Sequence, residues 1–187
     1  MAVRTIVTYP NPVLKEQCAA VTEFDDALCT LIDDMVETMN EADGLGLAAN
    51  QIGLPLRIFT MALPTSDEED ASVETFEIVN PEILSRSGEI RFEEGCLSFP
   101  GISELVKRAE RVQLRYQDRS GASIVRDFDG VAAVCVQHEF DHLEGVTFVD
   151  RLSPLKRRLA MRAYKRAAAQ ARFDEEDEGR SAVRPWR

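Results

Sequence analysis

Both histidines of the 187-residue chain lie in one six-residue stretch, QHEFDH at 137–142, and a glutamate directly follows the first of them. On a helix, residues four apart stack on one face, so His138 and His142 can both bind one metal ion. Glu139, beside such an ion, can act on a water molecule bound there. The HExxH spacing therefore predicts a metal-dependent hydrolase. The alternative is two ordinary core or surface histidines that lie close together by chance.

A catalytic metal site of this kind needs a third protein ligand and one open position. Cys135 lies one turn before His138, but residues 135 and 142 are about 10 Å apart along a helix. Ligand atoms around one ion lie within roughly 3–4 Å of each other, so the third ligand must come from another segment. Cys96 is the best candidate, because EEGCLSFPG places it in a turn after a strand. The remaining cysteines are interpreted as small apolar core residues: Cys18, Cys29 and Cys135.

The composition is that of a globular protein, with 44% hydrophobic and 29% charged residues. No apolar run approaches the ~18 residues of a membrane-spanning helix. The N-terminus lacks the apolar core of a secretory signal, so the scattered cysteines are expected to be reduced thiols in a bacterial cytoplasm. A net charge of −11 argues against general nucleic-acid binding, although residues 151–173 contain Lys and Arg but no acidic residue.

Elements that position the motif can be predicted from apolar periodicity and from turn residues. Five strands without alternating crossover helices predict an α+β fold, with antiparallel or mixed sheets packed around a central helix that carries HExxH and with a C-terminal helix added. Residues 1–172 are expected to form one catalytic domain, and residues 173–187 a charged, flexible tail. The expected helices cover 25–43, 131–144 and 154 to about 172, and the expected strands 56–62, 75–81, 88–95, 111–118 and 123–130.

Three stretches in this order resemble the signatures of the peptide deformylases: GLGLAANQIG at 44–53, EGCLSFP at 94–100 and QHEFDHLEG at 137–145. The flanking stretches YPNPVL and FVDRLSPLKR are also similar, so the resemblance covers about residues 4 to 170 and fits bacterial members with a C-terminal helix. HExxH alone would equally suit many metallopeptidases, whereas the three motifs together are specific.

The resemblance implies a metal-dependent hydrolase that removes the N-formyl group from the terminal methionine of nascent polypeptides and releases formate. It implies that Cys96, His138 and His142 hold the metal and that Glu139 is the general acid/base for attack of metal-bound water on the formyl carbon. Gln51 and the backbone N–H of Leu97 are then expected to stabilise the oxyanion. Fe²⁺ is the expected physiological ion, although Zn²⁺, Ni²⁺ or Co²⁺ suit the same ligands in the purified protein.

The substrate is expected to bind by strand addition along the glycine-containing segment at 44–46, with its methionine in an apolar pocket. Leu45, Asn50 and Phe99 occupy positions where the family varies, and Phe99 is expected to shape the cleft mouth. The predicted substrate-binding residues are Leu45, Gly46, Phe92, Glu94, Gly95, Val134 and Cys135.

Arg158, Arg162, Lys165 and Arg166 fall on one face of the predicted last helix. This face is either an ordinary solvated surface or a docking surface for ribosomal RNA near the exit of the peptide tunnel. Two other functions stay open at this point. One is an HExxH peptidase that cuts peptide bonds, and the other is a non-enzymatic, metal-stabilised module that binds ribosomes or nascent chains.

Overall fold

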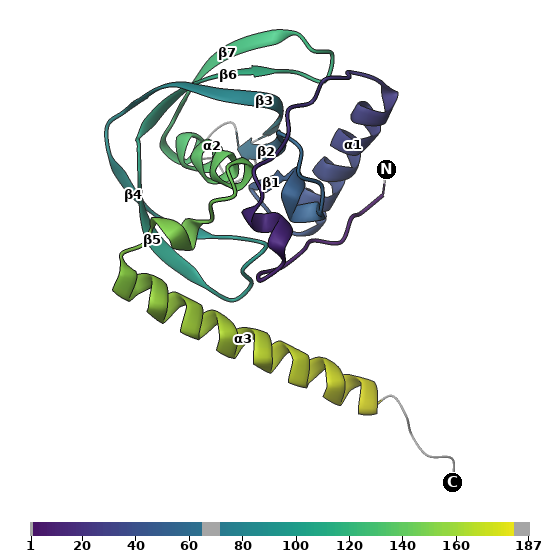
Figure 1. The fold of residues 1–187 in the computed structure, drawn as a ribbon, viewed down its shortest axis with the longest axis vertical. Coiled ribbons are helices and arrows are strands. Elements are labelled where there is room, and N and C mark those ends of the chain that lie inside the picture. Colours follow the sequence, from purple (N-terminus) through teal and green to yellow (C-terminus); the bar gives the residue numbers. More distant parts are fainter. Residues whose placement is uncertain (1, 65–71, 182–187) are drawn as a thin grey trace.

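The structure is a computed structural model that describes residues 2–64 and 72–181, with side chains as far as residue 171. Figure 1 shows one larger sheet, one small sheet and three α-helices. The larger sheet is antiparallel with the order β1-β2-β3-β6-β7, formed by Gly46–Ala48, Ile58–Pro64, Val73–Ser87, Arg111–Gln117 and Ser123–Asp129. The small sheet pairs β4 (Ile90–Gly95) with β5 (Ser103–Arg108). The predicted α+β fold is confirmed.

Helix α2 (Gly130–Leu143) carries the HExxH motif through the middle of the molecule, between the large sheet and the β4–β5 sheet (Figure 1). From Ala133 to Leu143 every residue except Phe140 is buried. A helix that is surrounded on all sides lacks a solvent-facing polar stripe, which explains why its sequence is apolar around most of its circumference. The surrounding sheets therefore fix the directions in which His138, Glu139 and His142 point.

Helix α1 (Asp26–Glu41) packs against β1 and β2 through the predicted apolar stripe, in which Leu28, Ile32, Met35 and Met39 are buried. The Asp25 carboxylate caps it by accepting a hydrogen bond from the Leu28 N–H at 2.9 Å. The helix ends at Glu41, two residues before the predicted end at residue 43, and Asp43 adopts the left-handed conformation with φ of 50°.

Gly44, which follows this helix end, is required to be a glycine by its packing against Leu97. A Cβ atom on Gly44 would lie 2.9 Å from Cδ1 of Leu97, closer than side chains approach one another. The absence of a side chain lets the start of β1 lie directly against the segment that follows β4.

Two strands were not predicted, and each lacks a clear apolar alternation. Strand β1 has only three residues. In β5 the two buried side chains are Val106 and the charged Arg108, while the apolar Leu105 on the other side is 54% exposed, so the apolar residues do not mark one face. Strand β3 also runs further than predicted, beyond Pro81 to Ser87, because a register shift against β6 between Val79 and Glu82 accommodates the proline.

Three short 3-10 helices, Pro12–Lys15, Ala49–Ile52 and Phe148–Arg151, connect the larger elements. The last helix, α3 (Pro154–Ser181), is longer than predicted, since no proline interrupts the stretch between about residue 172 and Ser181. Residues 182–187 of the predicted tail lie outside the described residues. No helix in the described part of the chain is long and apolar enough to span a membrane.

Candidate active site

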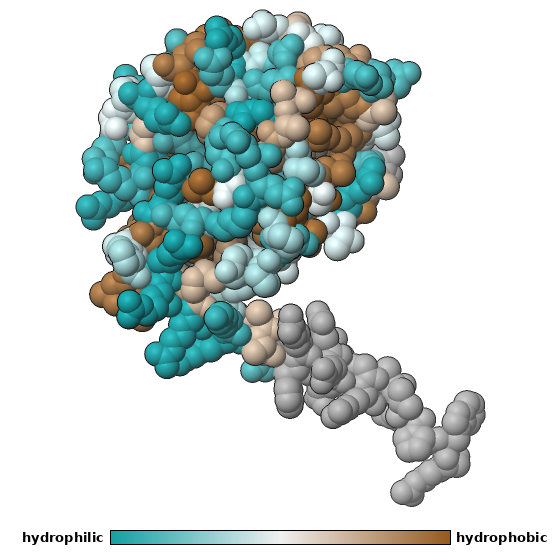
Figure 2. Space-filling model, viewed as in Figure 1, coloured by the Kyte–Doolittle hydropathy of each residue, from teal (hydrophilic) through white to brown (hydrophobic). Residues whose placement is uncertain are grey.

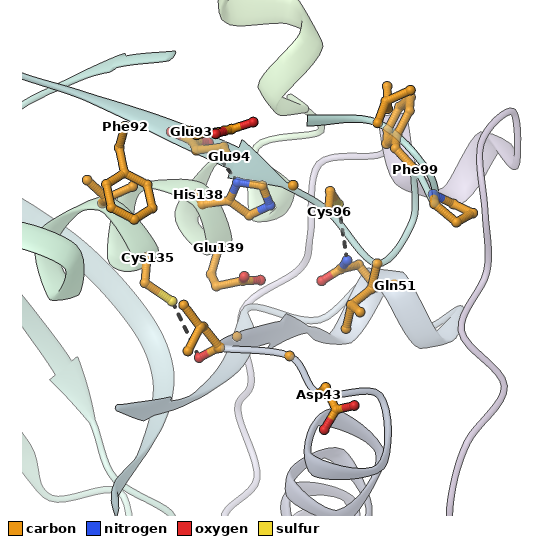
Figure 3. Close-up of a pocket in the computed structure, with 18 of the residues that line it drawn as sticks. Asp43, Gln51, Phe92, Glu93, Glu94, Cys96, Phe99, Cys135, His138 and Glu139 are labelled. Atoms are coloured by element: carbon orange, nitrogen blue, oxygen red, sulfur yellow. Dashed lines mark hydrogen bonds and ion pairs between the residues drawn. The ribbon is translucent and has the colours of Figure 1, made fainter. Parts of the chain in front are cut away.

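A cavity of about 390 Å³ opens between β1, β4 and one face of α2, and the predicted site residues line it (Figure 3), except for the fully buried His142. Its floor is formed by His138 and Glu139 of α2, and its walls come from residues 43–46 on one side and 92–95 on the other. Residues 96–102, which connect β4 to β5, close a third side. Because these segments are far apart in sequence, the cavity depends on the whole fold.

Cys96, His138 and His142 converge at the base of this cavity, and one ligand atom from each lies within 4.8 Å of the others. Sγ of Cys96 is 3.3 Å from Nε2 of His142. Burial lowers the pKa of His142 well below its ordinary value, which keeps this imidazole neutral, as a metal ligand must be. One thiolate and two imidazoles in this arrangement suit a single divalent ion.

The other nitrogen of His138 is held by a buried set of charges. Nδ1 of His138 lies 2.8 Å from the Glu94 carboxylate, which also accepts two hydrogen bonds from the Arg108 guanidinium. Arg108 donates in addition to Asp141 at 2.6 Å, and Asp141 accepts from Arg151 near the surface. Burial of Glu94 opposes its ionisation, but the hydrogen bonds from Arg108 and His138 outweigh it and lower its pKa to about 2. The ionised Glu94 therefore fixes the orientation of the His138 ring.

Glu139 is buried and points into the cavity beside His138 (Figure 3). Its burial raises the pKa of the carboxyl group to about 7. One oxygen, Oε2, has no hydrogen-bond partner among the described residues and is free to accept a proton. A Cβ atom on Gly46 would lie 2.5 Å from Oε1 of Glu139, so only glycine at this position of β1 leaves room for the carboxylate.

Gln51 is oriented from both ends of its amide group. Its Oε1 accepts a hydrogen bond from the Ala48 N–H at 2.8 Å, and its Nε2 donates to the Ser98 hydroxyl at 3.2 Å. The same Nε2 lies 3.5 Å from Sγ of Cys96, so the amide faces the predicted metal ligands. Leu97 follows Cys96 directly and lines the same cavity.

The family model described as polypeptide deformylase matches residues 3–158 of the chain. The chain belongs to the peptide deformylase family. It is 45% identical over 174 residues to the peptide deformylase of Alkalilimnicola ehrlichii, an alignment that covers 93% of this chain and 96% of the relative.

Solved structures agree with this assignment. The crystal structure of a peptide deformylase from Legionella pneumophila is 46% identical, has a TM-score of 0.82, and is matched over 91% of this chain and 99% of that one. The Met-Ala-Ser-bound peptide deformylase of Acinetobacter baumannii is 36% identical, with a TM-score of 0.75 over 81% of this chain and 99% of that one.

Members of the peptide deformylase family remove the N-formyl group from nascent polypeptides, and the chain is such a hydrolase. The deformylase interpretation therefore prevails over the two alternatives, a peptidase and a non-enzymatic binding module.

The predicted substrate residues all line the cavity, but they differ in what their side chains do. Leu45 is 48% exposed at the mouth, whereas the Cys135 thiol is buried and donates to the backbone oxygen of Leu45 at 3.5 Å. The carboxylate of Glu94 is already paired with Arg108 and His138, so it orients the His138 ring from the cavity wall. Phe99 is fully buried in the cavity wall. Phe92 and Val134 give the deformylase cavity an apolar part.

Several residues that support the site were missed by sequence reasoning. Asp141 lies within the motif itself, and a carboxylate on so apolar a helix could have been identified as a buried ion-pair partner. Asn50 holds α2 by donating to the backbone oxygen of His142 at 2.7 Å. Arg108, Ser98 and Arg151 carry no local signal, because their partners lie in segments distant from them in sequence.

Proposed function

We propose that Cys96, His138 and His142 hold the catalytic metal of this deformylase and that Glu139 is its general acid/base. The convergence of Cys96, His138 and His142 beside the cavity that Glu139 lines carries the proposal, since Cys96 lies more than forty residues from the others in sequence. Fe²⁺ is the proposed physiological ion, and the same ligands accept Zn²⁺, Ni²⁺ or Co²⁺. When bound, such an ion lowers the pKa of a water molecule at its open position.

Glu139 is suited to moving the proton of this reaction. A carboxyl group with a pKa of about 7 can accept a proton and return it near neutral pH, which is the requirement for general acid–base catalysis. We propose that Oε2 takes the proton of the attacking water and delivers it to the nitrogen of the leaving amine. Gly46 leaves room for this carboxylate, because a Cβ atom there would lie 2.5 Å from Oε1 and displace it.

The negative oxygen that develops on the formyl carbon needs donors that are already in position. We propose the Nε2 group of Gln51 and the backbone N–H of Leu97 for this role. The hydrogen bonds from the Ala48 N–H and to Ser98 support it, because they hold the Gln51 amide in one orientation before substrate arrives.

Peptide binding is proposed to follow the free edge of β1. This strand is the last in its sheet and, among the residues that the structure describes, pairs with β2 alone, so the backbone of Gly46 is available to an extended peptide. The methionine side chain is then proposed to enter the apolar part of the cavity near Phe92, Val134 and Cys135. The relative from Acinetobacter baumannii binds the tripeptide Met-Ala-Ser, and we propose that the same class of peptide binds here.

Formate release from formyl-Met-Ala-Ser tests the proposal, with the protein prepared anaerobically and loaded with Fe²⁺. At equal metal content, Glu139→Gln is expected to lose about 10²–10⁴-fold in kcat. Glu144→Gln, which removes a carboxylate outside the cavity at the end of α2, should keep the rate of the parent. Equal rates for Glu139→Gln and the parent would exclude Glu139 as the base, and cleavage of peptide bonds in the unformylated peptide would instead indicate a peptidase.

We also propose that the basic face of α3 docks on ribosomal RNA. Arg158, Arg162, Lys165 and Arg166 are exposed and have no carboxylate within ion-pair distance among the described residues. By contrast, Arg157 on the other side of the helix pairs with Asp150 at 2.7 Å. A row of unneutralised cations on an acidic protein favours a polyanionic partner.

Ribosome sedimentation at increasing salt concentration tests this docking. Replacing the four residues of the basic face by Gln should weaken binding and reduce the salt slope by roughly one unit for each phosphate that is no longer neutralised. The matched control replaces four exposed basic residues of the strands by Gln: Arg91, Lys107, Arg111 and Arg115. Equally weakened binding in both variants, or binding that does not depend on salt, would contradict docking on RNA.

The proposed catalytic unit is residues 1–172, since every residue of the site lies within it. We propose that this unit acts in a bacterial cytoplasm, where nascent formyl-methionyl peptides arise. The bacterial origin of the relatives named above supports this setting.

A further inference from the structure

The first described residues of the chain lie against parts of the molecule that are far apart in sequence. Residues 2–9, called here the N-terminal segment, belong to no helix or strand. Figure 1 shows this segment in purple, running beside α1 toward the short helix Pro12–Lys15. In Figure 2 hydrophobic residues gather at the surface over α1, and Ile6 of the N-terminal segment packs against the apolar cluster that contains this helix.

The start of the N-terminal segment is fixed to α1 by polar contacts. The Ala2 N–H donates to the Asp34 carboxylate at 2.6 Å, and the Arg4 N–H donates to the Thr38 hydroxyl at 2.8 Å. The Arg4 guanidinium also donates to Asp34, at 2.6 and 2.9 Å. Because Asp34 and Thr38 are both buried, helix α1 fixes where the rest of the segment begins.

Beyond this anchor, two backbone N–H groups of the segment hold the two parts of the proposed oxyanion site. The Val7 N–H donates to the Gln51 carbonyl at 2.7 Å, and the Tyr9 N–H donates to the Ser98 carbonyl at 3.0 Å. Gln51 is one proposed donor to the oxyanion, and Ser98 directly follows the other donor, Leu97. One segment therefore contacts the backbone at both donors.

These contacts limit the distance between the two donors. Val7 and Tyr9 are two residues apart in the chain, so their N–H groups can be separated by at most about 7 Å. The Tyr9 ring also stacks on Phe99, with centroids 5.1 Å apart, which fixes the turn after Leu97 a second time. An oxyanion site is effective only when its donors are in position before the reaction, so a change in this distance must lower the rate.

We propose that the N-terminal segment positions the oxyanion site for deformylation and that Val7 is the positioning residue for Gln51. The inference rests on the proposed roles of Gln51 and Leu97. Among the described residues, the segment makes no hydrogen bond to any of the three proposed metal ligands. Loss of the Val7 hydrogen bond is therefore expected to affect the reaction rate and to leave the metal site as it is.

Kinetics of the full-length, Fe²⁺-loaded protein on formyl-Met-Ala-Ser test this inference. Val7→Pro removes the N–H group and should lower kcat about 10–10²-fold, with KM within about threefold of the parent. Thr8→Pro is the matched control, because it introduces the same ring at a residue whose N–H has no hydrogen-bond partner among the described residues. The control should keep kcat within about threefold of the parent. An equal loss in the two variants would overturn the inference.

If Val7→Pro does not fold, Asp34→Ala takes its place in every measurement. This variant removes the carboxylate that holds Ala2 and Arg4, so it releases the start of the N-terminal segment from α1. It should lower kcat about tenfold, again with little change in KM. A parent-like kcat in a folded Asp34→Ala protein would count against the segment as a positioning element.

A double-mutant cycle separates positioning from a general decrease in stability. Gln51→Ala alone should lower kcat about 10²–10³-fold. In that background Val7→Pro should cost less than about threefold more, because the group that it positions is absent. Equal factors for Val7→Pro with and without Gln51 would refute the inference.

Two further results distinguish failure of the inference from failure of the proposed function. In the Co²⁺-loaded protein, Val7→Pro should keep the thiolate-to-metal absorption band of the parent, and a shifted band would show that the segment acts on the metal site instead. A parent-like rate for Gln51→Ala would refute the proposed oxyanion role of Gln51 itself. A slow Gln51→Ala with a parent-like Val7→Pro would leave that role intact and overturn only the inference.

Discussion

Helices α2 and α3 lie in opposite environments. Helix α2 is enclosed by both sheets, and almost all of its residues from Ala133 onward are buried. Helix α3 lies at the surface, and only Ala160 and Tyr164 among its described side chains are buried. The chemistry of α2 can be identified from local spacing, whereas the contacts of α3 depend on residues distant in sequence.

The two helices also differ in how their charges are neutralised. On α2 the buried Asp141 accepts hydrogen bonds from Arg108 and Arg151. On α3 the basic face has no such partner among the described residues. Buried charges must be paired because desolvation is costly, while exposed charges are free to bind an external partner. The comparison therefore predicts large effects for changes around α2 and small ones on the exposed face of α3.

Replacing Arg108 by Met is expected to have the largest effect. It leaves Glu94 and Asp141 buried without this cationic partner, and breaking a buried pair in this way costs roughly 3–5 kcal/mol of unfolding free energy. Urea denaturation measures this decrease. Arg115→Met, at an exposed pair with Glu82, should change stability by less than about 1 kcal/mol. Similar decreases in the two variants would remove the contrast between buried and exposed charges.

Gly46→Ala tests how tightly α2 is enclosed. The added methyl group must displace the Glu139 carboxylate, since its Cβ would lie 2.5 Å from Oε1. A displacement of this size near the reacting atoms can lower the rate about 10²-fold while the protein remains folded. Formate release and thermal melting, measured together, check this prediction. Parent-like activity would mean that the carboxylate has more room than the structure gives it.

Ala160→Glu tests the inner face of α3. A carboxylate at this buried position must be desolvated or must push the helix away from Phe99, so a decrease in stability of about 1–3 kcal/mol is expected. Ala163→Glu places the same charge on an exposed position of the same helix and should be nearly neutral. Differential scanning calorimetry of the pair checks the prediction, and equal melting temperatures would show that α3 does not pack as described.

The smallest effect is expected at Asp150, which joins the start of α3 to the body. Burial opposes its ionisation, but hydrogen bonds from Lys15 and Thr147 outweigh it and keep its pKa below the usual range. Because the folded-state pKa is lowered, this stabilisation is complete above the unfolded pKa of roughly 3.9 and disappears as the pH falls through the folded value.

Asp150→Asn should therefore cost about 1 kcal/mol at pH 7 and progressively less below about pH 4. Urea denaturation across this pH range measures the difference from the parent. Asp127→Asn, at an exposed carboxylate on β7, serves as the control. A cost for Asp150→Asn that does not depend on pH would show that the ionised carboxylate is not what stabilises this junction.

The parts of the fold that were predictable are those with a local physical signal. The apolar stripe of α1, the HExxH spacing on α2 and the alternation in β6 were all assigned correctly from neighbouring residues. Strand β5 was not predicted, because one of its buried residues is the charged Arg108 rather than an apolar residue. The extension of β3 beyond Pro81 to Ser87 was missed because proline normally ends a strand, and the bulge against β6 permits it to continue.

The residues of the site also divide into those that could be predicted from sequence and those that could not. Motif residues such as Cys96 and Gln51 could be proposed from sequence because they lie in glycine-bracketed turns that resemble a known family. The residues that support them could not be predicted, because Arg108 meets Glu94 only when β4 and β5 pair, and Asp141 only when this sheet packs on α2. The contact between Tyr164 and Tyr9 could not be predicted from local sequence either, since the two residues are 155 positions apart in the chain.

The identity of the cysteine that joins the two histidines tests the central claim most directly. Absorption spectra of the Co²⁺-loaded parent, Cys96→Ser and Cys135→Ser would reveal which thiolate is bound, because only a coordinated thiolate gives a charge-transfer band. The band should vanish in Cys96→Ser and persist in Cys135→Ser, although Cys135 lies on α2 itself. A band that vanishes without Cys135 and persists without Cys96 would contradict a metal site assembled between α2 and the segment after β4.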